Sequence, residues 1–306
     1  MSVFGKKLRS DGRAAVVIDG SSLHVASVTR ARGERPSVTG LQTFSIPDDG
    51  LDGAALRQSM NRNDMRLPAT TLLDPSEYQL LLVEAPDVRP DELRSAVRWR
   101  IKDLISFHID DAVIDVFEIP DQRQQHRNRM MYAVAAKSSA VQERAAALEN
   151  AGLAVTVVDI PEMALRNLAM LSPAEKNGVA LLHLEEERGV ITISRQGTLF
   201  LTRHWEIGLR QVREASDASA LDGILLEVQR SLDYYDSHFP HGMVAEVMLT
   251  PESYRIEGLT DFLGQHVTQP IRELRLGDLL EGCGDVTTSG ELLSVGAALR
   301  FEERTL

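Results

Sequence analysis

Hydrophobic and polar residues follow two different repeats along the chain. A two-residue alternation, typical of strands, recurs in short runs, and many of these runs are followed by the three-to-four-residue repeat of amphipathic helices. Residues 14–18 and 23–28 predict two strands joined by turn residues 19–22, and residues 37–46 predict a third. These strands would form a meander. Residues 48–70 predict an irregular segment with one short helix over 54–60.

The middle of the chain alternates between strands and helices. One helix is predicted to begin after Pro90, which is pre-organised for a first helical turn. Ser139 to Gln142 predict a capping box for another helix, which Gly152 ends. The predicted elements are a strand over 77–84, a helix over 91–105, strands over 112–119 and 130–136, a helix from 139, a strand over 154–159 and a helix over 161–171.

A second block repeats the opening pattern. It predicts a meander of three short strands over 178–184, 190–194 and 198–202, followed by a long amphipathic helix over 220–239. The remaining predicted elements are a strand over 244–249, a helix over 259–266, a strand over 271–274 and a closing helix over 289–301. Two meanders, each followed by helices and strands, indicate an internally duplicated α/β chain.

Composition and charge narrow the class of protein. Hydrophobic residues make up 43% of the 306 residues and charged residues 25%, as in folded soluble proteins. No apolar run reaches the roughly 18–20 residues that span a bilayer, and residues 1–13 lack the apolar part of a signal peptide. A single cysteine, Cys283, excludes a disulfide within the chain. We therefore expect a cytoplasmic protein.

The charge is unevenly divided. Residues 1–150 hold 20 basic and 21 acidic side chains, and residues 151–306 hold 13 and 24, so their net charges are −1 and −11. Binding to nucleic acid needs clustered basic charge, so the acidic second half argues against it. A small basic excess before residue 14 could touch anionic lipid, or it could simply be a solvated tail.

Several longer strings are more specific. They are ELRSAVRWR (92–100) with ISF (105–107) and DAVID (111–115), VAAK (134–137) with LENAGL (148–153), VVDI (157–160) and ALRN (164–167), EVQRSLDYY (227–235), and VGAALR (295–300). In this order, over nearly the whole chain, they resemble the PilM family of type IV pilus proteins. The segment lengths and weak glycine loops favour a resemblance to MshI, the PilM-like member of mannose-sensitive haemagglutinin (MSHA) pilus systems. The cytoplasmic domain of GspL-type secretion proteins is a related possibility.

This resemblance implies the actin-like ATPase fold, a ribonuclease H-like fold that is duplicated and here carries a 1C-type insertion. The implied subdomains are 1A over residues 1–76, the 1C insertion over 77–158, a return to 1A over 159–175, 2A and 2B over 176–280, and a closing helix of 1A over 281–306. The family recruits the cytoplasmic tail of a PilN-type or MshJ-type membrane partner. The resemblance thus implies a protein peripheral to the inner membrane.

An actin-type site for ATP and Mg²⁺ needs glycine turns whose backbone N–H groups face the phosphates. The first implied turn is Asp19-Gly20-Ser21-Ser22, which lacks the spacer residue that the family has after the aspartate, so a plain hairpin turn is the favoured interpretation. The second turn should fall within 182–189, where Glu185 to Glu187 would repel a triphosphate or could bind a cation. The adenine turn should follow residue 249, but residues 250–253 contain no glycine.

The long helix of the second half keeps the family pattern at Glu227 and Arg230, although the two can equally form an exposed intrahelical pair. Since three of four elements depart from the pattern, we expect a scaffold that binds its partner without a catalytic cycle and holds no cofactor. The alternative is an ATP-binding switch whose nucleotide state regulates partner binding. An actin-family sugar kinase would need the same intact phosphate turns.

The helix over 91–105 carries the most distinctive surface residues. Arg98 and Trp99, followed by Phe107, are of types enriched at interfaces, so we expect them to help form a partner-docking surface. The alternative is that Trp99 packs against its own subdomain. His238 and His241 have a metal-like spacing, but a helix end explains them without a metal. No local base supports a catalytic role for Cys283.

Overall fold

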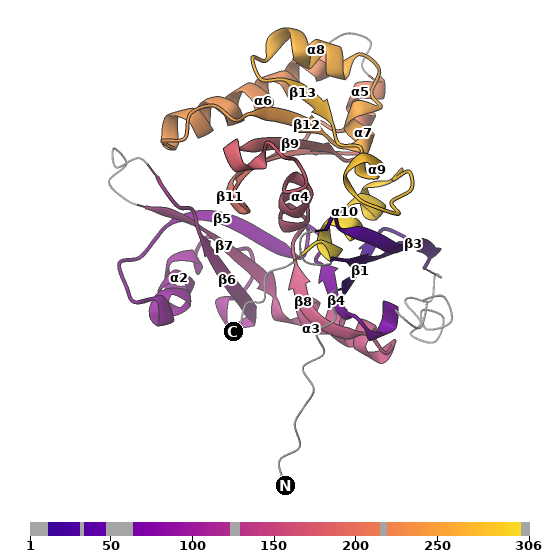
Figure 1. Cartoon of the computed structure of the whole chain (residues 1–306). Helices are drawn as coiled ribbons and strands as arrows, with labels where there is room; N and C mark the ends of the chain where they lie inside the picture. Colours follow the sequence, from indigo (N-terminus) through magenta and orange to yellow (C-terminus); the bar gives the residue numbers. More distant parts are fainter. Residues whose placement is uncertain (1–11, 31–33, 47–63, 123–128, 215–218, 301–306) are drawn as a thin grey trace.

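The computed structural model describes residues 12–30, 34–46, 64–122, 129–214 and 219–300. Within these residues the chain forms three β-sheets with helices packed between and around them (Figure 1). The helix expected over 54–60 lies outside the described residues. Two large sheets share a central pair of helices, and the smaller third sheet lies to one side of them.

The first sheet has five strands: β1 (Gly12–Asp19), β2 (Ser22–Thr29), β3 (Ser37–Ser45), β4 (Pro68–Leu72) and β8 (Ala154–Asp159). Their order in space is β3-β2-β1-β4-β8. The predicted meander is confirmed, because β1 pairs antiparallel with β2 and β2 pairs antiparallel with β3. β4 lies parallel to β1, and β8 lies parallel to β4.

The second sheet repeats this topology with β9 (Val179–Leu184), β10 (Gly189–Arg195), β11 (Thr198–Trp205), β12 (Glu246–Leu249) and β13 (Ile271–Glu273). The order is β11-β10-β9-β12-β13, again an antiparallel meander followed by two parallel strands. All six side chains of β9 are buried, as expected for a strand covered on both faces. The duplicated pattern read from the two meanders is therefore present in the sheets.

The third sheet, called here the insertion sheet, is formed by β5 (Tyr78–Glu84), β6 (Ala112–Glu118) and β7 (Met130–Lys137). Its strands are antiparallel in the order β5-β7-β6, and they lie in the sequence between β4 and β8 of the first sheet. The expected boundary at residue 158 differs from this arrangement. Residues 154–158 belong to β8, because that strand pairs with β4 through the parallel ladder of the first sheet.

The helices cover the faces of the sheets. α2 (Leu93–Ile101) packs on the insertion sheet, α3 (Ser138–Asn150) lies next to β8, and α6 (Ser219–His238) packs on the second sheet. The shorter helices are α5 (Leu209–Glu214), α7 (Pro251–Tyr254), α8 (Leu259–His266) and α9 (Leu276–Leu279), with 3-10 turns at η1 (Asp64–Arg66), η2 (Pro90–Glu92), η3 (Ile109–Asp111) and η4 (Glu175–Asn177).

Two helices occupy the centre of the molecule, α4 (Pro161–Ala169) and α10 (Ser289–Ala298) (Figure 1). They cross at Gly296, where an added Cβ would lie 2.5 Å from the carbonyl oxygen of Ala164. Only glycine allows this close approach. The Asn167 side chain also donates to the Gly296 carbonyl at 2.9 Å. α10 begins with a capping box in which Thr288 and Glu291 satisfy each other's backbone N–H groups.

Three local predictions differ from the structure. The helix expected to reach residue 105 ends as an α-helix at Ile101. The capping box expected at Ser139 is absent, because α3 begins at Ser138 and no side-chain hydrogen bond caps it. β4 begins inside the stretch expected to be irregular and extends two residues beyond it. That strand is only five residues long, begins with proline and is held by distant neighbours on both sides, so local pattern alone does not reveal it.

Candidate functional site

Two hollows lie beside the central helices. The first, called here the cleft, has a volume of about 570 Å³ and lies between the two large sheets. The second, called the groove, has a volume of about 730 Å³ and lies between the insertion sheet, α4 and the start of β11. The cleft is lined by Asp19 and by residues of the second and third turns expected to face a nucleotide, so these turns come first.

The first turn, at residues 19–22, is the tip of the β1–β2 hairpin and Asp19 lines the cleft. Asp19 pairs with Ser22, which leaves a two-residue turn in which Gly20 takes a φ of +54°. The Ser21 carbonyl accepts a hydrogen bond of 2.7 Å from the Ile46 N–H at the end of β3. The turn is therefore the tip of a continuous hairpin at the edge of the cleft.

The second turn, Glu185 to Arg188, joins β9 to β10 and is covered by α5. The carbonyls of Glu185 and Glu186 accept hydrogen bonds of 2.9 and 3.0 Å from the N–H groups of Leu209 and Arg210. The side chains are paired as well: Glu186 with Arg213, Glu187 with Arg210, and Glu185 with Arg188 at 2.5 Å. The three glutamates thus anchor a neighbouring helix.

The third turn, expected at residues 250–253, is a helix start instead of a glycine pair. Thr250 precedes α7, and Glu252 in its first turn lines the cleft. Both carboxyl oxygens of Glu252 are buried without a hydrogen-bond partner among the described residues. Burial raises the pKa of Glu252 to about 7, so this carboxyl is easily protonated near neutral pH.

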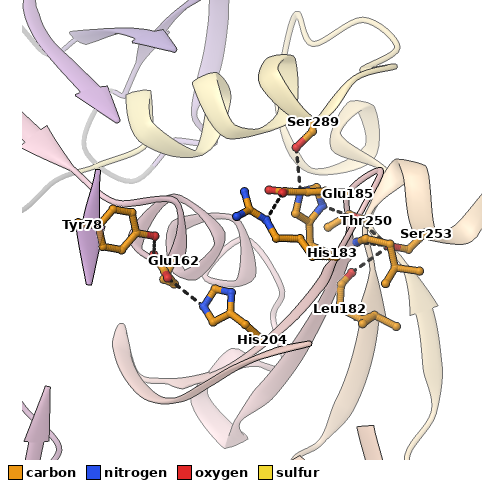
Figure 2. Close-up of polar contacts among 11 residues, drawn as sticks. Tyr78, Glu162, Leu182, His183, Glu185, His204, Thr250, Ser253 and Ser289 are labelled. Carbon is orange, nitrogen blue, oxygen red and sulfur yellow. Dashed lines mark hydrogen bonds and ion pairs between the residues drawn. The ribbon is translucent and has the colours of Figure 1, made fainter. Parts of the chain in front are cut away.

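His183 was not identified from the sequence, yet it is the central polar residue behind the cleft (Figure 2). Its ring is fully buried in β9, with Nδ1 2.9 Å from the hydroxyl of Thr250 and Nε2 2.9 Å from the hydroxyl of Ser289. Burial lowers the pKa of His183 to about 4, so its ring is neutral at physiological pH. The only local signal was a polar residue inside an otherwise apolar strand, LLHL.

Glu227 and Arg230 lie elsewhere, on α6. Arg230 donates to Glu227 at 2.7 Å, and Arg203 of β11 lies 3.6 Å from the same carboxylate. Neither residue is among those that line the cleft in the described part of the chain. The structure therefore places them in an ion-pair cluster on the second sheet, as the intrahelical alternative predicted.

The groove has an apolar floor and charged ends. Met163 of α4, Leu199 of β11 and Phe117 of β6 contribute apolar surface, and Val113 of β6 is 44% exposed beside them. The groove is also lined by Leu73, Asp115, Glu118, Val134, Ala136, Val141, Val158, Asp159, Ile160, Arg166, Gly197, Thr198 and Arg300. The groove lies where the insertion sheet meets the rest of the molecule.

One end of the groove holds a buried ion pair. Asp159 is paired with Arg300, which follows α10, and also accepts a 3.0 Å hydrogen bond from the Ile160 N–H. Burial is the largest influence on Asp159 and raises the pKa of this carboxyl, whereas Arg300 acts in the opposite direction. Arg166 lies at the same end and donates to Asn167 at 2.7 Å.

The three residues expected to form a docking surface differ in their surroundings and do not form one surface. Phe107 packs into the core beneath α2, and Arg98 is paired with Asp110 at 3.0 Å and donates to the Ala112 carbonyl. Trp99 is 73% exposed, with the Lys102 ammonium 5.6 Å from its ring centroid, so the alternative in which it packs against its own subdomain is wrong. None of the three lines the groove in the described chain.

The remaining candidate residues from the sequence are His238, His241 and Cys283. No group of His, Cys, Asp or Glu side chains in the described chain could hold a metal ion. His241 lies 3.6 Å from Asp121, and His238 stacks on Tyr234. Burial raises the pKa of Cys283 to about 11, which suppresses the reactive thiolate. Among the described helices, none is long and apolar enough to cross a membrane.

Comparison with known proteins connects this architecture to a family. Residues 80–216, from the insertion sheet to α5, match the family model described as type IV pilus assembly protein PilM. Over these residues the chain is similar to PilM. No curated protein sequence gives a match.

Solved structures similar to this PilM-like chain agree on its fold. A PilM–PilN type IV pilus biogenesis complex matches with 19% identity and a TM-score of 0.67, over 94% of this chain and 95% of that one. The cytoplasmic domain of EpsL, an inner-membrane component of the Vibrio cholerae type II secretion system, matches with 13% identity and a TM-score of 0.51, over 95% of this chain and 96% of that one.

A Bacteroides thetaiotaomicron protein with an actin-like ATPase fold matches with 7% identity and a TM-score of 0.50, over 89% of this chain and 93% of that one. The expected actin-like ATPase fold is therefore confirmed, as is the resemblance to PilM. The fold is also similar to that of a secretion-system cytoplasmic domain of the kind expected for GspL-type proteins.

Proposed function

We propose that this protein is a cytoplasmic scaffold of a type IV pilus assembly platform, peripheral to the inner membrane. It would bind the cytoplasmic segment of a PilN-type membrane partner, and within the family we assign it to the MshI branch, with an MshJ-type partner in an MSHA-like pilus. The observation that carries this proposal is the groove beside the insertion sheet in a PilM-like chain.

The shape and chemistry of the groove suit a peptide segment. Its volume of about 730 Å³ is in the range of well-formed ligand sites, and its floor is apolar. Carboxylates of β6 lie along it, and Arg166 and the Asp159–Arg300 pair lie at one end. A segment with apolar anchors and flanking charges of both signs would match this surface. Such anchors supply affinity while charged rims supply orientation.

The cleft suits a scaffold better than an enzyme. A nucleotide would need backbone N–H groups aimed at its phosphates, whereas here the second turn anchors α5 and carries three glutamates. Glu252 adds a further acidic group where the adenine turn was expected. These features support a degenerate nucleotide site and a protein without a catalytic cycle.

An ATP-binding switch is the competing function, since Asp19 and the start of α10 still line the cleft. Calorimetric titration of the protein with ATP and ADP in Mg²⁺ at low salt separates the two. We expect no heat and no thermal stabilisation at millimolar nucleotide. Micromolar binding would make the switch the leading function.

Partner binding is tested with two matched variants. Val113→Asp places a charge in the groove, and Val88→Asp places the same charge at a similarly exposed valine outside it, the two side chains being 44% and 40% exposed. Fluorescence anisotropy with labelled cytoplasmic segments of PilN-type and MshJ-type proteins measures affinity. We expect Val113→Asp to weaken binding by about tenfold or more and Val88→Asp to leave it unchanged. Equal affinities for both variants would rule out the groove.

The same anisotropy titrations test the assignment of this protein to the MshI branch. Tighter binding of the MshJ-type segment than of the PilN-type segment is expected for an MshI-like protein. The reverse order would keep the scaffold function and remove the MSHA assignment.

A further inference from the structure

Side chains connect the two sides of the cleft. Arg255, which follows α7, donates to the carbonyls of Val286 and Thr287, and a hydrogen bond between two side chains lies at the base. His183 belongs to β9 in the centre of the second sheet, and Ser289 is the first residue of α10, which packs against the first sheet. The imidazole Nε2 lies 2.9 Å from the Ser289 hydroxyl (Figure 2). The two halves of the molecule are therefore joined by a hydrogen bond between their own side chains.

The contact is the end of a longer buried chain. The Ser253 hydroxyl donates to the Leu182 carbonyl at 3.4 Å and lies 3.0 Å from the Thr250 hydroxyl, which lies 2.9 Å from His183 Nδ1. Each hydroxyl carries one proton. The order in which Ser253 donates to the carbonyl requires Thr250 to donate to Ser253 and the Nδ1–H to donate to Thr250. Nε2 is then an acceptor for the Ser289 hydroxyl.

The His183 ring lies between the hydroxyls of Thr250 and Ser289. The His183 ring is fully buried and neutral, and a neutral imidazole offers one donor and one acceptor, which matches a hydroxyl on each side. Loss of the Ser289 hydroxyl would leave Nε2 buried without its partner, which is costly in a low-dielectric interior. The geometry therefore favours one position of α10 relative to β9.

The second turn, Glu185 to Arg188, is also held in place at the rim of the cleft. α5 donates backbone hydrogen bonds to the carbonyls of Glu185 and Glu186, and an added Cβ at Gly208 would lie 2.5 Å from the Glu185 carbonyl oxygen. This close packing fixes the β9–β10 turn at the rim of the cleft. A turn held in this way cannot rearrange around a ligand without breaking contacts with α5.

We propose that the His183–Ser289 bridge is a built-in lock that holds the two halves closed without a nucleotide. The fold places a cleft between two sheets, and here protein groups rather than a bound ligand connect its sides. The lock keeps α10 and α4 in a fixed position, and since α4 forms part of the groove, the groove is preformed. The proposal does not depend on which partner occupies the groove.

Hydrogen–deuterium exchange on the full-length protein, free of any partner, tests the lock. Ser289→Ala removes the bridge, and Ser294→Ala is a matched control on the same helix, because the Ser294 hydroxyl donates within α10 to the Glu291 carbonyl. We expect Ser289→Ala to raise the exchange rates of amides in both β9 and the first turn of α10 by about tenfold. Ser294→Ala and the hydroxyl-retaining Ser289→Thr should exchange like the natural protein.

Two results would overturn the proposal. One is an unchanged exchange rate on the β9 side of the cleft in Ser289→Ala. The other is slower exchange of the natural protein's cleft amides when millimolar ATP and Mg²⁺ are added, which would show that a nucleotide closes it. The ¹⁵N spectrum of the His183 ring gives a second readout that needs no variant. The Nδ1–H tautomer supports the donor order derived above, and the Nε2–H tautomer contradicts it.

Discussion

The Tyr78 hydroxyl donates a 2.7 Å hydrogen bond to the carboxylate of Glu162, and this buried contact joins β5 of the insertion sheet to the first turn of α4 (Figure 2). Glu162 is 1% exposed, and its other oxygen lies 3.0 Å from Nε2 of His204 on β11. One carboxylate therefore connects the insertion sheet, a central helix and the second sheet.

Tyr78→Phe should destabilise the protein by about 1–3 kcal/mol, because it removes a donor from a buried carboxylate while keeping the ring. Urea unfolding at neutral pH measures the change in free energy. Tyr254→Phe is the control, since its ring lies partly exposed near Arg255 and Arg275. A loss no larger for Tyr78→Phe than for Tyr254→Phe would show that the carboxylate is solvated.

His183 should make the protein acid-sensitive. Its pKa is lowered to about 4 in the folded state from an ordinary value of 6.5, because burial disfavours the charged ring. The unfolded chain binds the proton first, so stability is complete above pH 6.5 and falls as the pH drops toward 4. Between pH 7.5 and 5 we expect a loss of roughly 2 kcal/mol from this residue. Urea unfolding of His183→Gln, which cannot titrate, should show a correspondingly smaller loss.

Glu252 should make the protein less stable as the pH rises, which is the opposite of the effect of His183. Burial raises its pKa to about 7 from 4.5, so the carboxyl favours folding below pH 4.5 and loses that contribution as the pH rises through 7. Glu252→Gln removes the penalty of a buried negative charge. At pH 8 we expect the variant to be more stable than the natural protein by roughly 1–3 kcal/mol, with most of the difference gone at pH 5. Thermal unfolding across this range checks the sign.

The ion pair at the end of the groove should be costly to break. Arg300→Met leaves Asp159 buried without its cationic partner, so we expect a loss of about 3–5 kcal/mol in the free energy of unfolding. The double variant Arg300→Met with Asp159→Asn removes both charges and should recover part of that loss. No recovery would mean that the arginine stem, rather than its charge, stabilises this corner.

Trp99→Ala should change the free energy of unfolding by less than about 0.5 kcal/mol, because the side chain is 73% exposed. The same variant tests whether Trp99 takes part in docking. If folding and the affinity for the partner segment both survive, Trp99 has no docking role. A weaker affinity with unchanged stability would extend the partner surface from the groove onto α2.

Much of the fold could be predicted because its elements are locally encoded. The alternation over residues 14–28 and the apolar runs of β9 and β10 specify strands without reference to the rest of the chain. β4 could not be predicted in this way, since its pairing with β8 joins residues about 86 positions apart, such as Pro68 and Ala154. Ser139 failed as a cap because the same hydroxyl types also suit an ordinary first turn.

The candidate site was predicted less completely, because its contacts join residues that lie far apart in the sequence. The departures at Asp19, Glu185 and Thr250 were visible because the family pattern states which residues belong there. The partners of His183 were not visible, since Thr250 and Ser289 lie 67 and 106 positions further along the chain. Exposure of Trp99 likewise depends on which face of α2 packs on the insertion sheet.

The crossing of α4 and α10 at Ala164 and Gly296 has a mechanical consequence. Backbone meets backbone there, without a compressible layer of side chains between the helices. A load applied at the groove enters α4 and passes through this stiff junction into α10 and the first sheet. In the scaffold proposed above, a pull on a partner bound in the groove would thus be carried by the whole molecule instead of being absorbed at one hinge.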